Sequence, residues 1–155
     1  MEKSTISMLE VIRLSIAEEI TKKYHLPYDS AEQKFEQSVT WSVIQDVSTD
    51  FYLKSTTELF SIYESELRMD QYLEKQLQRK SPNLISNGMM GKLAKRFAIL
   101  YTMSIEESLN WMKKSDEYQS LLKQLQRGEQ IESPQLFHKK VLKKKKTSLE
   151  KRILE

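Results

Sequence analysis

The chain has 155 residues, a formal net charge of +3 and no cysteine, which excludes disulfides and cysteine-based zinc sites. Its 3 glycines and 3 prolines are too few for a strand-rich fold with many tight turns, so the composition predicts an all-α protein. Charged side chains such as Glu10 and Arg13 interrupt the N-terminal apolar pattern. This segment is typical of neither a signal peptide nor a membrane span, and we expect a cytoplasmic protein without membrane contact.

The charge is distributed unevenly along the chain. Residues 1–66 contain 6 basic and 12 acidic residues, a net charge of −6, and residues 67–155 contain 19 basic and 10 acidic residues, a net charge of +9. This asymmetry predicts a charged partner for one or both ends, or head-to-tail self-association. A solvated acidic half followed by a solvated basic tail is the simpler alternative.

Four helices are predicted in the first half. Ser7–Glu10 has the spacing of a capping box, and apolar residues follow at helical intervals to about Tyr24, before the break at Pro27. A second helix should end near Ser38, and a short third helix carries Trp41. After a turn over residues 46–50, a serine-capped long helix is expected over 55–79.

The second half shows the same order of signals after a predicted linker over 80–88. A helix carries Leu93 and Phe97, and Ser104–Glu107 forms a capping box that opens the next helix. A third helix carries Tyr118 and should stop near residue 128, and a serine followed by a proline at 133–134 opens a terminal helix.

A shift of about 77 residues superimposes the two halves. The pairs that match in character are Ile16 with Leu93, Ala17 with Ala94, Ile20 with Phe97, Tyr24 with Tyr101, Ala31 with Ser108, Phe35 with Met112, Ser38 with Ser115, and Trp41 with Tyr118. We therefore predict two similar four-helix modules that arose by internal duplication and are joined by the long helix. The first module covers 1–79, the linker 80–88, and the second module 89–155. Chance alignment of two helical stretches is the alternative.

Part of the first module resembles a known sequence pattern. Its residues are Ile16-Ala17-Glu18-Glu19, Tyr24, Ala31, Phe35, Ser38, Trp41, Ile44, Asp46, Thr49, Tyr52, Ser55 and Glu66. The stretch 16–66, about a third of the chain, resembles an uncharacterised all-helical module of small proteins from Gram-positive bacteria and mobile elements. The second half lacks the Asp-Thr-Tyr turn of this pattern. The resemblance implies a genomic setting, near toxin–antitoxin genes in some relatives, and no particular chemistry.

The two halves differ at four positions that are charged in the first and apolar in the second. Lys22, Lys23, Glu32 and Lys34 correspond to Ile99, Leu100, Leu109 and Trp111. Because each large apolar side chain gains about 1.5–3 kcal/mol on leaving water, these four should be covered. The cover is either internal, on helix 55–79 or the C-terminal helix, or it is a protein partner or a second copy. In the latter case Trp111 is the predicted anchor.

No catalytic apparatus, metal site or cofactor is predicted. Only His25 and His138 are present, and neither has a second histidine at metal-ligand spacing. The sequence also lacks a phosphate-binding glycine loop and a nucleophile elbow. Carboxylates at 46, 50 and 58 do not have the spacing of a calcium loop. We therefore expect a protein that is not an enzyme.

Nucleic-acid binding is the alternative function. Residues 134–155 contain 8 basic and 2 acidic residues, a net charge of +6. The predicted phosphate contacts are Lys139, Lys140, Lys143, Lys144, Lys145, Lys146, Lys151 and Arg152. The stretch 93–114 also has the rhythm of a helix-turn-helix, but Glu106 and Glu107 at the start of its second helix would repel phosphates.

The favoured hypothesis is a non-enzymatic inhibitor or antitoxin-like protein that acts by protein–protein contact. Its partner would be a toxin or a host nuclease, and its acidic first module could imitate the charge of a nucleic acid. A homodimer is compatible with this hypothesis and with the alternative, a nucleic-acid-binding regulator that uses the basic tail.

Overall fold

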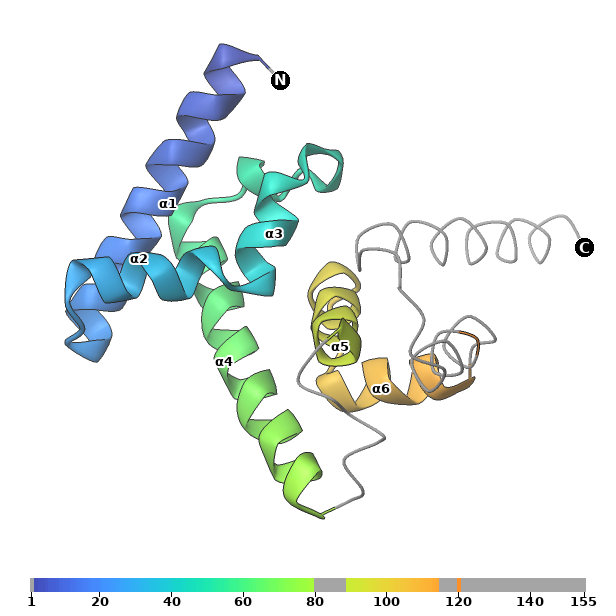
Figure 1. Cartoon of the computed structure of the whole chain (residues 1–155). Helices are drawn as coiled ribbons and strands as arrows, with labels where there is room; N and C mark the ends of the chain where they lie inside the picture. Colours follow the sequence, from blue (N-terminus) through green and yellow to red (C-terminus); the bar gives the residue numbers. More distant parts are fainter. Residues whose placement is uncertain (1, 80–88, 115–119, 121–155) are drawn as a thin grey trace, which may run out of the picture.

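The computed structural model describes residues 2–79, 89–114 and 120, and all regular structure within them is helical (Figure 1). The α-helices are α1 (Lys3–Tyr24), α2 (Tyr28–Glu36), α3 (Val39–Gln45), α4 (Thr56–Arg79), α5 (Met89–Leu100) and α6 (Ile105–Lys114). Two 3-10 turns, η1 (Val47–Thr49) and η2 (Phe51–Leu53), connect α3 to α4. This confirms the all-α prediction for the described residues. None of the helices in these ranges combines the length and the apolar character that a membrane span needs.

The predicted start of the first helix is wrong. Its hydrogen bonding already begins with the amide of Ile6, which donates to the carbonyl oxygen of Glu2 at 3.1 Å, so Ser7 lies inside α1 and does not cap it. Residues 3–7 contain no proline or glycine, and the helix therefore begins five residues closer to the N-terminus than the capping box indicated.

The predicted caps at Ser55 and Ser104 are confirmed, and Ser38, where only a helix end was predicted, is a third cap. The Ser38 hydroxyl accepts from the amide of Trp41 at 3.0 Å and begins α3. Ser55 and Ser104 accept from amides three residues ahead, each at 3.1 Å, at the starts of α4 and α6. Such bonds satisfy amides in the first helical turn that have no partner within the helix.

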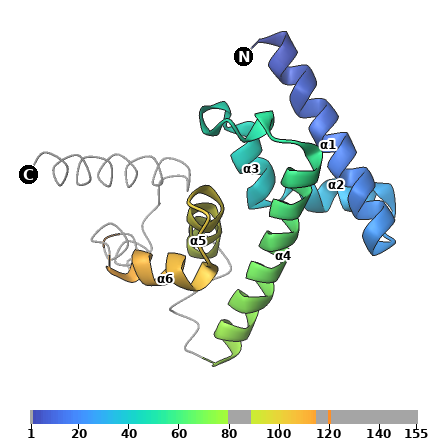
Figure 2. The same cartoon turned by 180° about the vertical axis from the view of Figure 1, so that it is seen from behind.

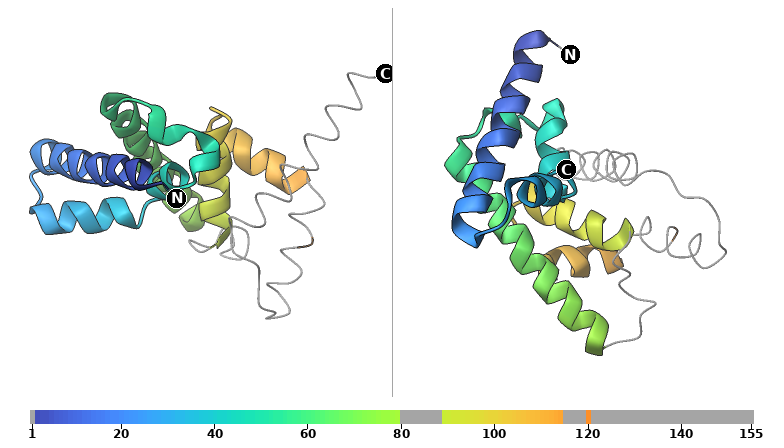
Figure 3. Two further views of the ribbon diagram at one scale, coloured as in Figure 1. Left: turned by 90° about the horizontal axis from the view of Figure 1, so that it is seen from above. Right: turned by 60° about the vertical axis from the view of Figure 1, so that its left-hand side comes forward.

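The first core lies between α1, α2, α3 and α4. Helices α1 and α2 pack on each other as a hairpin; their axes cross steeply in Figure 1 and overlap in the view from above in Figure 3. Ile16, Phe35 and Leu59 are fully buried where this hairpin meets α4. Phe35 also contacts the rings of Trp41 and Tyr63, with centroids 5.4 and 5.5 Å away. This packing explains why those apolar positions recur at helical spacing.

A second core forms where the α5–α6 hairpin packs against the later part of α4, as seen from behind in Figure 2. Leu73 of α4 joins Leu93, Phe97 and Met112 in this cluster. A smaller cluster joins the two parts of the chain, because Ile99 of α5 packs on Val39 and Val43 of α3. Helix α5 is thus held by both α3 and α4.

The linker 80–88 and the third and fourth helices predicted for the second module lie outside the described residues. The described residues therefore do not test the predicted duplication as a whole.

Candidate functional site

The N-terminal half of α1 carries large apolar side chains that nothing in the described residues covers. Ile6, Met8, Val11 and Leu14 are 52%, 41%, 62% and 41% exposed. We call these four residues the α1 stripe. In Figure 1 this half of α1 extends beyond α2, while Leu9 and Ile12 on the opposite side of the helix are buried in the first core. A helix that is apolar on both sides is typical of a segment covered from both sides.

Acidic side chains border the α1 stripe. Glu10 and Glu18 are exposed by 56% and 61%, and Glu19 is also exposed. Two of these carboxylates are paired, since Arg13 bonds Glu10 as well as Glu32 and Glu36, and Lys22 lies 3.3 Å from Glu18. The net negative charge of residues 1–66 therefore comes mainly from residues after α1.

A buried carboxylate lies where α3, α4 and α5 meet. Glu66 of α4 is only 2% exposed and accepts hydrogen bonds from the amides of Val39 and Thr40, at 3.0 and 2.7 Å. It also accepts from the Thr40 hydroxyl at 2.7 Å and from the Lys95 ammonium at 3.0 Å. Glu66 thus completes the N-terminal cap of α3 that Ser38 begins, and its negative charge suits the start of a helix.

Lys95 links α5 to α4 through two carboxylates. Its ammonium lies 3.0 Å from Glu66 and 2.8 Å from Asp70, and its side chain is 13% exposed. Burial alone would lower the pKa of Lys95, but the two carboxylates outweigh burial and raise the pKa above its ordinary value. The amine therefore stays charged at neutral pH.

Arg96, the next residue, links α5 to α3. Its guanidinium donates to the Ser42 hydroxyl at 3.2 Å and to the Asp46 carboxylate at 3.0 Å, and its side chain is 3% exposed. Burial lowers the pKa of Arg96, and Asp46 partly opposes this shift. Asp46 also accepts from the amide of Ser48, so one carboxylate stabilises both the turn after α3 and the position of α5.

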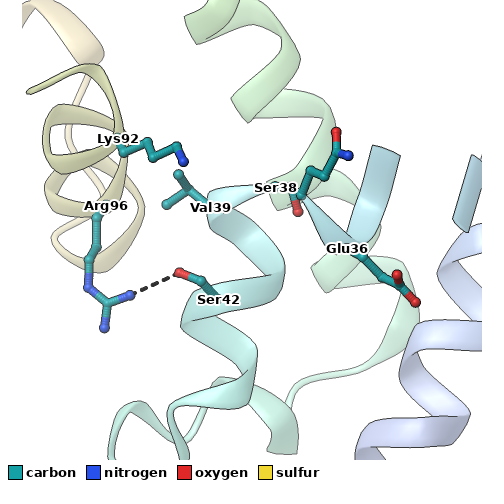
Figure 4. A pocket seen from close by; sticks show the side chains of 7 residues that line it. Glu36, Ser38, Val39, Ser42, Lys92 and Arg96 are labelled. Atoms are coloured by element: carbon teal, nitrogen blue, oxygen red, sulfur yellow. Dashed lines mark hydrogen bonds between the residues drawn. The ribbon is translucent and has the colours of Figure 1, made fainter. Parts of the chain in front are cut away.

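Two hollows flank the junction of α2 and α3. The larger, of about 420 Å³, lies between this junction and α5 and is shown in Figure 4. Its lining includes Ser42, Lys92 and Arg96. The smaller, of about 280 Å³, lies toward α4, and its lining includes Glu66 and Lys95.

The four residues predicted to bind a partner lie against the rest of the chain. Ile99 is 8% exposed on α3, and Leu109 is 9% exposed in the second core. Leu100 and Trp111 are half-buried, and the Trp111 ring meets Phe97 edge to face at 5.0 Å. Ile99 and Leu109 are therefore buried within the chain, but Ile99 is covered by α3, which was not among the predicted covers. Partner binding by these residues stays a prediction.

The other proposed sites fall into two groups. The basic residues from Lys139 to Arg152 lie outside the described residues. The helix pair proposed as a helix-turn-helix exists as α5 and α6, but Lys95 and Arg96 of α5 face α3 and α4 and are engaged there. The described ranges contain no group of three or more residues placed to hold a metal ion.

The structural roles of Glu66, Lys95 and Arg96 were not predicted from the sequence. The position of Glu66 in α4 could have indicated its burial. It lies three residues after Tyr63 and seven before Leu73, on the same face of the helix as these buried side chains. An acidic residue at a core position of a helix indicates a buried hydrogen-bonding partner. For Lys95 and Arg96 no comparable signal exists, since both simply follow Leu93 and Ala94.

Comparison with family models, with curated proteins and with solved structures finds no match to this chain.

Proposed function

We propose that the protein is a non-enzymatic binding protein that acts by contact with a partner protein, as an inhibitor or antitoxin does. The observation that carries this proposal is the α1 stripe, four large apolar side chains exposed by 41–62% on one half of one helix. Met8, Val11 and Leu14 follow one another at three-residue spacing and so lie along one side of α1, and exposed apolar side chains grouped in this way mark interaction surfaces. The antitoxin-like setting is supported only by the resemblance of residues 16–66.

The partner surface that fits the α1 stripe is an apolar strip bordered by basic side chains. The support for a basic border is the net charge of −6 over residues 1–66, the part of the chain that carries the stripe. A partner with complementary charge associates faster and in one orientation, while the apolar contact supplies most of the affinity. A basic nuclease or toxin has this chemistry.

Two matched substitutions test the proposal. Val11 on the stripe and Leu53 on η2 are exposed by 62% and 61%, so Val11→Asp and Leu53→Asp place the same charge at equally exposed apolar positions. A photo-reactive amino acid at each position, in cells that express the protein, identifies what lies against it. The partner is then purified and its affinity for each variant is measured.

The proposal expects a cross-linked protein at position 11 and none at position 53. It also expects Val11→Asp to weaken binding of that protein by at least about tenfold, with Leu53→Asp within about twofold and both melting temperatures unchanged. An equal loss of affinity in both variants would overturn the proposal. A cross-link from position 11 to a second copy of this chain or to a nucleic acid would also overturn it.

We further propose that the α1–α2 and α5–α6 hairpins are the equivalent parts of two duplicated modules. Helices α2 and α6 begin at residues 28 and 105, an offset of 77. The residues with positive φ after α1 and α5 are His25 and Thr102, at 54° and 51°, again 77 apart. Pairs of equal burial, at 0–1% exposure, are Ile16 and Leu93, Ala17 and Ala94, Ile20 and Phe97, Ala31 and Ser108, and Phe35 and Met112. Chance alignment would not be expected to match turn geometry as well as burial.

The second candidate function is a nucleic-acid-binding regulator, favoured by the net charge of +6 over residues 134–155. Binding to generic DNA or RNA that falls steeply with salt, and that disappears on truncation at Gln135, would support it. Binding that persists after this truncation would count against it.

A further inference from the structure

The hollow between α3 and α5 brings two polar pairs face to face. Lys92 and Arg96 are one turn apart on α5, and Ser38 and Ser42 are one turn apart along the start of α3. Figure 4 shows both cationic side chains reaching across toward α3. The volume of about 420 Å³ falls within the range of small-molecule sites.

The charge of Lys92 is not compensated in this hollow. Lys92 is exposed and makes no ion pair within the described part of the chain, whereas Lys95 and Arg96 both pair with carboxylates. Ser42 only accepts a hydrogen bond from Arg96 at 3.2 Å, so its hydroxyl proton can be donated to a ligand. The Lys92 ammonium and the Ser42 hydroxyl therefore line the same hollow from opposite walls.

The acidic residue at the edge of the hollow does not oppose an anion strongly. In Figure 4 the Glu36 carboxylate points away from Lys92 and Arg96. It lies 3.1 Å from the Arg13 guanidinium, which offsets its charge. The amides of Val39, Thr40 and Trp41 are already bonded to Glu66 and Ser38, so side chains, not the start of α3, would hold the ligand.

From this arrangement we infer that the hollow binds a small organic phosphate, with Lys92 and Ser42 on the phosphate oxygens. A lysine ammonium is a common phosphate ligand, and a tetrahedral oxyanion can accept from groups on two walls at once. The hollow is larger than a bare phosphate requires, and Val39 adds an apolar wall for the organic part. This site is separate from the α1 stripe, so its failure would leave the proposed function untouched.

Phenyl phosphate, inorganic phosphate and phenol serve as probes in ¹H–¹⁵N NMR titrations of the full chain at constant ionic strength. Phenyl phosphate should shift the amides of residues 36–42 and 92–96 in a saturable manner. Inorganic phosphate should bind more weakly, and phenol should cause no saturable shift. Equal affinity for phenyl phosphate and inorganic phosphate, or saturable binding of phenol, would overturn the assignment.

Lysine variants locate the binding. Lys92→Gln should weaken phenyl phosphate at least fivefold, Lys92→Arg should retain most of the affinity, and Lys22→Gln on α1 should stay within twofold. The melting temperature of each variant is measured alongside, and Lys92 is exposed, so the fold should tolerate all three changes. Equal effects of Lys92→Gln and Lys22→Gln, or shifts spread over all exposed lysines, would show nonspecific charge attraction and overturn the site.

Discussion

The Glu66 carboxylate on α4 and the Lys95 ammonium on α5 lie 3.0 Å apart, although 29 positions separate them in the sequence. Both are largely buried, with side chains 3% and 13% exposed. The same carboxylate caps α3 through the amides of Val39 and Thr40. One side chain thus connects three helices, and the position of α5 depends on polar contacts as well as on apolar packing.

Glu66→Ala should lower the free energy of unfolding by about 3–5 kcal/mol, because it leaves two helix-start amides without an acceptor and the buried Lys95 ammonium with Asp70 alone. Glu58→Ala is the matched control on the same helix, since Glu58 is 62% exposed and lies 4.0 Å from Lys54. We expect the control to change stability by no more than about 0.5 kcal/mol. Urea denaturation measures both, and similar losses would contradict the assigned role of Glu66.

Ala31→Ser should be tolerated, with a loss below about 1 kcal/mol in the free energy of unfolding. The equivalent residue in the second hairpin, Ser108, is fully buried and donates to the carbonyl oxygen of Ala94 at 2.7 Å. If the hairpins are equivalent, the hydroxyl introduced at position 31 has the carbonyl of Ala17 in the same place.

Ala17→Ser is the control for this substitution, because it makes the same change at another fully buried alanine, whose equivalent residue Ala94 carries no hydroxyl. Both variants are compared by thermal unfolding, and Ala17→Ser should lose more stability. Equal losses in the two variants would argue against equivalent hairpins.

Thr102→Gly should raise stability by about 0.5–1 kcal/mol, and His25→Gly should raise it less. Both residues have positive φ, at 51° and 54°, a region that a β-branched side chain such as threonine disfavours most. Glycine removes this strain but adds freedom to the unfolded chain, so the net gain is small. Thermal unfolding of the two variants shows which one gains more stability. A larger gain in His25→Gly than in Thr102→Gly would contradict the prediction.

Stability should fall as the pH rises from about 10 to 12. Burial raises the pKa of Tyr63 from 10.0 to about 12, and the pKa of Lys95 is raised above 10.5 by Glu66 and Asp70 despite its burial. A group whose pKa is higher in the folded state binds its proton more tightly there. Its contribution is therefore complete below the pKa of the unfolded state and is lost as the pH passes the folded value.

Tyr63→Phe should remove about 2 kcal/mol of this pH dependence, as judged by urea denaturation at pH 8 and pH 11.5. Tyr28→Phe is the control, because the Tyr28 side chain is 38% exposed. An unchanged pH dependence in Tyr63→Phe would show that the buried phenol does not contribute to it.

The sequence by itself determined the helices and most of their ends. Ser55 and Ser104 were recognisable as caps because a hydroxyl bonds an amide three residues ahead, which is a local interaction. Core positions such as Ile16 and Phe35 were likewise evident, since one helix places its apolar residues on one face. The predicted start of α1 was wrong because no residue from 3 to 7 stops a helix from extending beyond a capping sequence.

Only the tertiary structure decided which apolar surfaces are covered and which charges are paired. The sequence indicated that Ile99 needs a cover, but α3 provides that cover from about 60 positions away. Lys95 and Arg96 resemble ordinary solvated charges until α5 meets α3 and α4, and the register of Glu66 indicated burial without showing its partners. Such contacts depend on distances between helices, which the periodicity within a single helix does not contain.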